Sequence, residues 1–311
     1  MAEIPFVTLA EPRYGAAVPV SPLVRRVIAN NPSKYTYLGT GTYIVGHGDV
    51  AVIDPGPILD EHREALVAAL DGARVRAILV THCHSDHSPL AAWLREETGA
   101  PTIAFGPHGS VEVDPDMDPE INAAIEDGVT LEETTDTDFD PDVRVGDGEV
   151  AAMGVGWTMR AVHTPGHTSN HMCYALDEEH ALFTGDHVMG WSTTVVSPPD
   201  GDMRAYIDSL RKVMARDDAT LWPTHGAPVT SPQPFLQAFL EHRLQREAQV
   251  MAAVRSGVTD IEAMVKSMYA DVREELHRAA ARSVLSHLMK LVDDGAVTLE
   301  RKGETTKYFP N

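Results

Sequence analysis

Short apolar runs separated by turn residues recur along the first part of the chain. Residues 35–55 mix β-branched and aromatic side chains with glycine, a pattern typical of two or three short antiparallel strands. Residues 75–81 form a short, mostly apolar run, which predicts a buried strand. Further strand signals occupy residues 101–107 and return over 143–187. The pattern therefore predicts a fold built on sheets.

Helical spacing of apolar residues appears between and after these strands. It predicts helices over residues 59–70, 88–99, 203–215 and from 232 onward. Ser88 is suited to cap the second of these helices, and Gly99 is suited to end it. Strands, helices, strands and helices in this order favour two stacked sheets with helices outside.

The pattern changes after residue 236. Three helical stretches precede "AVTLERKGETTKYF", whose alternation predicts a hairpin that turns at Lys302-Gly303. We therefore expect residues 1–236 to form a larger domain and residues 237–311 a small winged-helix-like domain. One helix of the small domain should bury an apolar face, within the tail or on the larger domain, because four residues recur at spacings of three and four: Val284, Leu285, Leu288 and Leu291.

Charge and composition argue against nucleic-acid-binding, disulfide-rich and membrane-spanning proteins. The 311 residues carry a net charge of −21, which opposes attraction to nucleic-acid phosphates. The acidic stretch 110–142 lacks periodicity and is predicted to be an exposed insertion. Two cysteines make no disulfide framework, and no secretory signal or membrane-length apolar run is visible. A cytoplasmic protein with no membrane partner is expected.

The stretch "THCHSDHSPL" (81–90) lies between a predicted buried strand and a predicted helix. Alternate residues of a strand share a face, so His82 and His84 should point the same way while Cys83 points away. Asp86 and His87 lie on the following turn and can face a second point nearby. Four ligand-type side chains at this spacing indicate a metal site rather than a solvated loop.

Three more ligand-type residues stand at the ends of apparent strands. They are His163 in "VHTPGH", Asp186 in "FTGDH" and His225 in "PTHG". Zinc accepts both histidine nitrogen and carboxylate oxygen, and a carboxylate can bridge two ions. We therefore expect two divalent ions per chain, of which zinc is the leading choice, held by His82, His84, Asp86, His87, His163, Asp186 and His225.

The motifs "HCHSDH", "HTPGHT", "TGDH" and "THG", in this order over residues 35–230, resemble the metallo-β-lactamase superfamily. The resemblance implies an α+β fold, an αββα sandwich with the metal site at one edge. It implies three ligand roles: His82, His84 and His163 for the first metal, Asp86, His87 and His225 for the second, and Asp186 as the bridge.

Within the superfamily, the chain looks similar to the branch that includes the β-lactamase-like endoribonuclease. The segments that carry this likeness are "GTGTYIVG", "GDHVMGWSTTVVSPPDGDMRAYIDSL" and a winged-helix tail beginning "EHRLQRE". Ser88-Pro89 departs from the glycines that many members have after the first histidine cluster.

Several residues have supporting or substrate roles in this interpretation. Asp54 is expected to support the metal loop, as carboxylates behind metal ligands do. His167, His171 and Trp191 are candidates for contact with substrate. Tyr206 is a candidate for the pocket wall or, as for most buried aromatics, for the core.

Three functions are compatible with the sequence. We favour a metallo-hydrolase that directs a metal-bridging hydroxide at a small carboxyl compound: an ester, thioester, lactone or β-lactam. Asp86 would be its catalytic residue and would orient that hydroxide. An RNA-cleaving phosphodiesterase is favoured by the branch resemblance but disfavoured by charge. A metal-sensing regulator that binds DNA ranks last, because seven ligands exceed what sensing needs. A homo-oligomer is left open.

Overall fold

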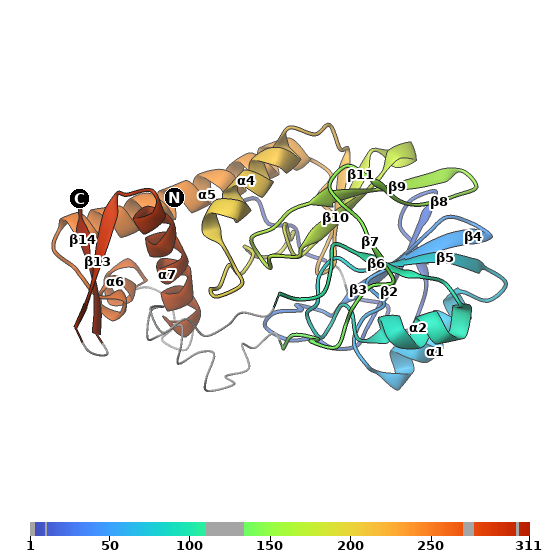
Figure 1. The fold of residues 1–311 in the computed structure, drawn as a ribbon. Helices are drawn as coiled ribbons and strands as arrows, with labels where there is room; N and C mark the ends of the chain where they lie inside the picture. Colours follow the sequence, from blue (N-terminus) through green and yellow to red (C-terminus); the bar gives the residue numbers. More distant parts are fainter. Residues whose placement is uncertain (1–3, 10, 110–133, 270–276, 303–304) are drawn as a thin grey trace.

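The computed structural model describes residues 4–9, 11–109, 134–269, 277–302 and 305–311. Two larger sheets form the body of these residues (Figure 1). The first sheet runs, in spatial order, through β1 (Val18–Pro19), β2 (Val24–Ile28), β3 (Gly41–Val45), β4 (Asp49–Ile53), β5 (Arg74–Leu79), β6 (Thr102–Ala104) and β7 (Val143–Arg144). Its strands are antiparallel from β1 to β4 and parallel from β4 to β7.

The second sheet is antiparallel except for one parallel pair, β11 and β12. Its spatial order is β12 (Thr220–Pro223), β11 (Ala181–Gly185), β10 (Met172–Leu176), β9 (Trp157–His163) and β8 (Val150–Gly154). A short 3₁₀ turn, η1 (Asp177–Glu179), joins β10 to β11.

Successive side chains of β4 point to opposite faces of the first sheet and so enter two different cores. Ala51 and Ile53 belong to the core between the sheets, whereas Val50 and Val52 belong to the core beneath the outer helices. A strand buried on both faces reads as a mostly apolar run, as β4 does. In β5, the predicted buried strand, Ala77, Ile78 and Leu79 are buried, whereas Arg76 is exposed.

Helices cover the outer face of each sheet (Figure 1). The first sheet is covered by α1 (Asp60–Ala69) and α2 (Leu90–Thr98), the second by α4 (Met203–Met214) and α5 (Pro232–Arg255). The predicted αββα sandwich is therefore confirmed.

The start of α2 differs from the prediction. Ser88 does not cap it: the helix begins at Leu90, and the Ser88 hydroxyl donates to Asp136 Oδ2 at 2.7 Å. Gly99 ends the helix with φ 69°, as expected.

The predicted acidic insertion falls partly outside the described residues. Residues 134–142 are described, and they are not simply an exposed loop. Thr135 pairs with His84 as an isolated β-bridge, and the Asp136 amide donates to the Cys83 carbonyl at 2.7 Å. This segment therefore lies directly against the histidine loop.

A compact C-terminal unit follows the sandwich (Figure 1). It contains the C-terminal half of α5 with α6 (Ile261–Met268), α7 (His277–Asp293) and an antiparallel hairpin of β13 (Val297–Lys302) and β14 (Thr305–Pro310). Gly303, the predicted turn residue, lies outside the described residues. The apolar stripe of α7 is buried inside this unit, against residues such as Val250 and Tyr308.

The predicted boundary after residue 236 falls inside the continuous helix α5. Leu236 and Phe239 pack in the sandwich core, whereas Val250 and Val254 pack in the C-terminal core. A single continuous helix therefore connects the two units, and the division at residue 236 stays a prediction. No helix in the described ranges combines the length and apolarity that crossing a membrane requires.

We predict that Phe239→Ala lowers the free energy of unfolding by about 3–5 kcal/mol, because it empties a fully buried site where α5 meets the second sheet. Urea denaturation measures the change. Val67→Ala, at a position on α1 that is 57% exposed, is the control and should change stability little. Equal effects of the two substitutions would contradict this packing.

Candidate metal centre

The candidate ligands lie on loops at one edge of the two sheets. The loops that follow β4, β5, β11 and β12 carry Asp54, the cluster His82–His87, Asp186 and His225, respectively. The loop between β9 and β10 adds His167. Since these loops leave neighbouring strands at the same edge, residues far apart in the sequence come together.

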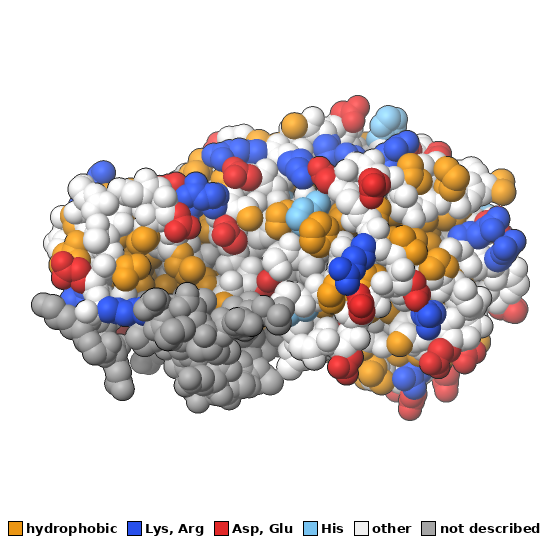
Figure 2. All heavy atoms as spheres, viewed as in Figure 1, with side chains coloured by type: hydrophobic (Ala, Val, Ile, Leu, Met, Phe, Trp, Pro, Cys, Tyr) orange, Lys and Arg blue, Asp and Glu red, His pale blue; other side chains and the backbone are white. Residues whose placement is uncertain are grey.

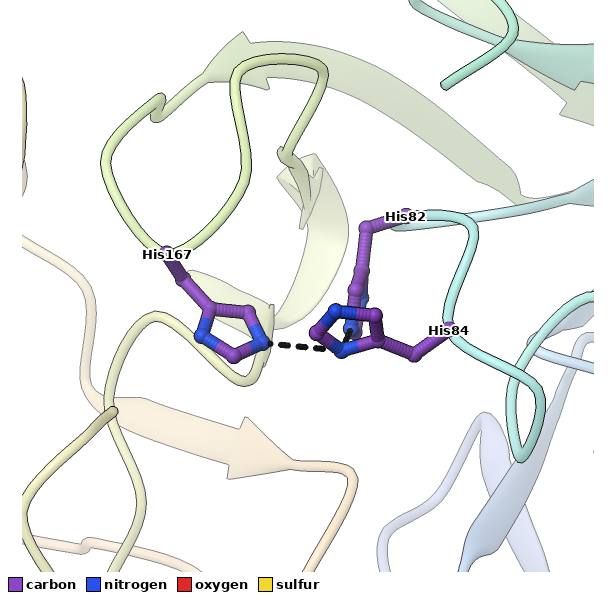
Figure 3. Close-up of side chains that lie close together, drawn as sticks. All are labelled: His82, His84 and His167. Atoms are coloured by element: carbon purple, nitrogen blue, oxygen red, sulfur yellow. Dashed lines mark hydrogen bonds between the residues drawn. The ribbon is translucent and has the colours of Figure 1, made fainter. Parts of the chain in front are cut away.

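Three imidazoles converge to form the first group, as Figure 3 shows. His82 Nε2 lies 2.9 Å from His84 Nδ1, which lies 3.2 Å from His167 Nε2. All three side chains are buried. A tetrahedral zinc ion with bonds of about 2.0–2.1 Å places neighbouring nitrogens about 3.3 Å apart, so this spacing fits a single ion.

His163 does not lie in this group, where the sequence predicted it. Its ring stacks on Phe105 with centroids 4.0 Å apart, and its Nε2 lies 3.2 Å from the Ser169 carbonyl oxygen. The residue still belongs to β9, whereas His167 stands on the turn that follows and reaches the edge. His167, predicted as a substrate contact, occupies the expected place of His163.

The second group consists of Asp86, His87 and His225. Asp86 Oδ2 lies 3.2 Å from His225 Nε2 and 3.4 Å from His87 Nε2. It also accepts a hydrogen bond of 2.8 Å from the Thr40 hydroxyl, a contact between residues 46 positions apart that no local pattern predicts. Oxygen and nitrogen donors of this kind suit zinc and related divalent ions.

Asp186 lies between the two groups. Its Oδ1 is 3.5 Å from His225 Nε2 and 3.7 Å from His87 Nε2, while its Oδ2 is 4.0 Å from His167 Nε2. Among the described residues, neither Asp186 Oδ1 nor His87 Nε2 has a hydrogen-bond partner, although both atoms are buried. Buried polar atoms are normally satisfied, so this pair fits a centre that a cation completes.

Asp54 connects three of the loops, as its predicted supporting role requires. Its carboxylate accepts hydrogen bonds from the Thr81 amide and hydroxyl at 2.8 Å each, and from the Thr224 hydroxyl at 3.1 Å. The same carboxylate lies 2.9 Å from His87 Nδ1. This contact with Asp54 orients the His87 ring so that Nε2 is directed at the second group.

Backbone carbonyls orient two other imidazoles in the same way. His167 Nδ1 lies 2.7 Å from the Val195 carbonyl oxygen, and His225 Nδ1 lies 3.2 Å from that of Gly39. An Nδ1–H that donates to a carbonyl fixes the tautomer whose Nε2 is free to bind a metal.

Electrostatics differ between the two groups. Burial and the neighbouring histidines hold the pKa of His82 and of His84 well below the usual value, which favours the neutral, ligating form. In the second group, burial opposes charge on His87, but Asp86, Asp186 and Asp54 raise its pKa to about 9. Burial would raise the pKa of Asp186, yet His225 and His87 lower it, so it is a carboxylate.

The other candidate residues have distinct places. His171 is fully buried, and its Nε2 accepts a hydrogen bond of 3.2 Å from the Asp186 amide, a contact that orients Asp186. Trp191 is partly exposed and stacks on Tyr37 with centroids 4.9 Å apart. Cys83 points away, as expected, toward the Asn170 amide at 3.0 Å. Tyr206 is a core residue.

Comparison with protein families agrees with a metal centre built from these histidines and aspartates. The model of the metallo-beta-lactamase superfamily matches residues 37–225, and the chain belongs to that superfamily of metal-dependent hydrolases. The beta-lactamase associated winged helix domain matches residues 261–304 in the C-terminal unit.

Similar curated proteins come from fungi. An atrochrysone carboxyl ACP thioesterase of Aspergillus chevalieri is 31% identical, with 93% of this chain and 87% of that protein covered. The lactamase-like protein notP of an Aspergillus species is 30% identical over the same shares. These relatives have thioesterase or lactamase-like names, so the expected likeness to the endoribonuclease branch is corrected.

A solved structure shares nearly the whole fold. The beta-lactamase domain protein from Burkholderia ambifaria superimposes with a TM-score of 0.79 at 22% identity, covering 96% of this chain and 95% of that one. At this identity, the likeness concerns the fold alone. It extends through the sandwich and the C-terminal unit.

We predict that His167→Ala lowers the number of divalent ions bound per chain, whereas His163→Ala leaves it unchanged. Only His167 belongs to the buried triad with His82 and His84. Elemental analysis of protein purified without chelator measures the ratio. Loss of metal from the His163→Ala variant, with retention in the His167→Ala variant, would instead make His163 the third ligand beside His82 and His84.

Proposed function

We propose that this protein is a zinc-dependent thioesterase that hydrolyses an acyl thioester at a centre of two metal ions. The observation that carries the proposal is the position of Asp186, which presents one carboxylate oxygen to each of two ligand groups. The similarity to proteins named as acyl-carrier-protein thioesterases supports the substrate class.

The ligand assignment follows from the two groups. His82, His84 and His167 would hold one ion, and Asp86, His87 and His225 the other, with Asp186 shared between them. When bound, such ions supply Lewis acidity toward a carbonyl oxygen and acidify water.

Asp86 is the side chain best placed to act on water. Its side chain is 17% exposed, against 5% for Asp186, so it lies nearer the open side of the centre. Burial would raise its pKa, but His87 and His225 lower it, so it is ionised. The hydrogen bond from Thr40 fixes one of its oxygens. An ionised, oriented carboxylate can accept a hydrogen bond from the attacking water.

Hydrolysis then forms a carbon–oxygen and a sulfur–hydrogen bond and breaks the carbon–sulfur bond and one oxygen–hydrogen bond of water. The water oxygen attacks the thioester carbonyl carbon, the carbon–sulfur bond breaks, and the leaving thiolate takes up the proton that water gave to Asp86. The products are a carboxylic acid and a free thiol. Trp191, partly exposed beside Gly226, is proposed as part of the wall that holds the acyl group.

Charge disfavours RNA as the substrate. The chain carries a net charge of −21. On the face drawn in Figure 2, basic side chains are interspersed with acidic ones and form no continuous strip. A polyanion would meet repulsion on such a surface.

We predict that Asp186→Asn reduces thioester hydrolysis by at least about a hundredfold while the Tm changes little, because an amide cannot present two anionic oxygens. Release of free thiol from acyl-pantetheine and acyl-carrier-protein thioesters measures the rate, with an ester, a β-lactam and an RNA oligonucleotide assayed alongside. Asp208→Asn, an exposed change on α4, is the control.

Faster cleavage of RNA than of every acyl substrate would replace the proposed function with a phosphodiesterase. A fully active Asp186→Asn variant would remove Asp186 from the centre.

A further inference from the structure

We propose that Arg243 is a positioning residue for the metal centre, acting from α5 on the orientation of His167. This inference rests on the assignment of His167 as a ligand in the proposed function. It identifies a role for the helix that joins the sandwich to the C-terminal unit.

Arg243 is a charged side chain in an unusual place. It is only 4% exposed, although arginine is rarely buried without a purpose. Its guanidinium carbon lies 4.9 Å from the centroid of the Tyr206 ring, and Nη2 donates a hydrogen bond to the Thr194 carbonyl oxygen. Burying a guanidinium is costly unless its surroundings compensate the charge. Here a carbonyl and an aromatic face compensate it in part, and Nε is buried with no hydrogen-bond partner among the described residues.

The backbone that Arg243 contacts leads directly to a candidate ligand. The next residue after Thr194 is Val195, whose carbonyl oxygen accepts the Nδ1 proton of His167 at 2.7 Å. This is the hydrogen bond that directs His167 Nε2 toward His82 and His84. The position of that carbonyl therefore depends on the conformation of residues 194–195.

Two further contacts hold the same loop in place. The Thr194 hydroxyl and the Tyr206 hydroxyl both donate to the His187 carbonyl oxygen, each at 2.9 Å. Arg243 contacts both donor residues: it donates a hydrogen bond to the Thr194 carbonyl oxygen and lies over the ring of Tyr206. Arg243 on α5 therefore contacts the loop of residues 186–195. This loop runs from Asp186 to Val195, whose carbonyl oxygen accepts the hydrogen bond from His167.

The chain offers a matched control on the same helix. Arg246 also lies over an aromatic ring, that of Tyr269 at 4.4 Å, and its Nη1 donates to Gln249 at 3.0 Å. Neither of these partners belongs to the loop that supports His167. Substitution of Arg246 therefore removes a similar cation–aromatic contact without touching that loop.

The test compares Arg243→Met, Arg243→Lys and Arg246→Met in the full-length protein. Zinc affinity is measured by competition with a chromophoric chelator. The Nδ1 proton of His167 is followed by NMR in metal-free protein. We expect Arg243→Met to weaken one of the two zinc affinities about tenfold, as loss of groups that orient ligands does, and to expose the His167 proton to exchange. Arg243→Lys should cause a smaller loss in the same direction, and Arg246→Met should cause neither change.

Unchanged zinc affinity and an unchanged His167 proton in both Arg243 variants would overturn the inference, as would equal losses in the Arg243 and Arg246 methionine variants. Where Arg243→Met does not fold, Arg243→Lys alone decides between these outcomes. Normal zinc binding by the unsubstituted protein with no thioester cleavage would contradict the proposed function and leave this inference standing.

Discussion

The positions of the metal-site loops depend on the hydrogen bonds that the Asp54 carboxylate accepts. Asp54 is buried, has a positive φ of 49°, and accepts from groups on the loops that follow β5 and β12. These strands belong to different sheets, so one side chain fixes the relative position of both halves of the sandwich at the edge where the ligands gather. Its contact with His87 extends that control to a candidate ligand.

The candidate metal centre contains several titratable side chains that are largely shielded from water. Neighbouring groups determine which of them are charged. Asp186 and Asp86 are carboxylates because His87 and His225 face them, while burial keeps His82 and His84 neutral. His82 and His84 are thus neutral nitrogen donors in one half of the centre. The other half is a set of paired charges, in which a divalent ion and protons compete for the same places.

Much of this arrangement could be predicted from the sequence. The motif "HCHSDH" placed His82, His84, Asp86 and His87 on one loop, and the apolar runs predicted the stacked sheets. These features are local, because strand alternation and short spacings decide them. The stripe on α7 was predicted equally well, since its period alone shows that one face is buried.

The exchange of His163 for His167 shows what local patterns leave undetermined. Both histidines lie in "VHTPGHT", four residues apart, and each follows or ends a strand. The choice depends on where β9 ends and on the Val195 carbonyl, which lies 28 residues further along the chain. Ser88 failed as a cap for a similar reason, because Asp136 reaches its hydroxyl from beyond the acidic stretch. Tertiary contacts of this kind carry no signal in the spacing of nearby residues.

Anomalous X-ray scattering at the zinc absorption edge, from crystals grown with zinc, tests whether the protein holds a centre of two ions. We expect two peaks, one among His82, His84 and His167 and the other among Asp86, His87 and His225, with the Asp186 carboxylate contacting both. A single peak, or a peak coordinated by His163, would contradict a centre of two ions built from these groups.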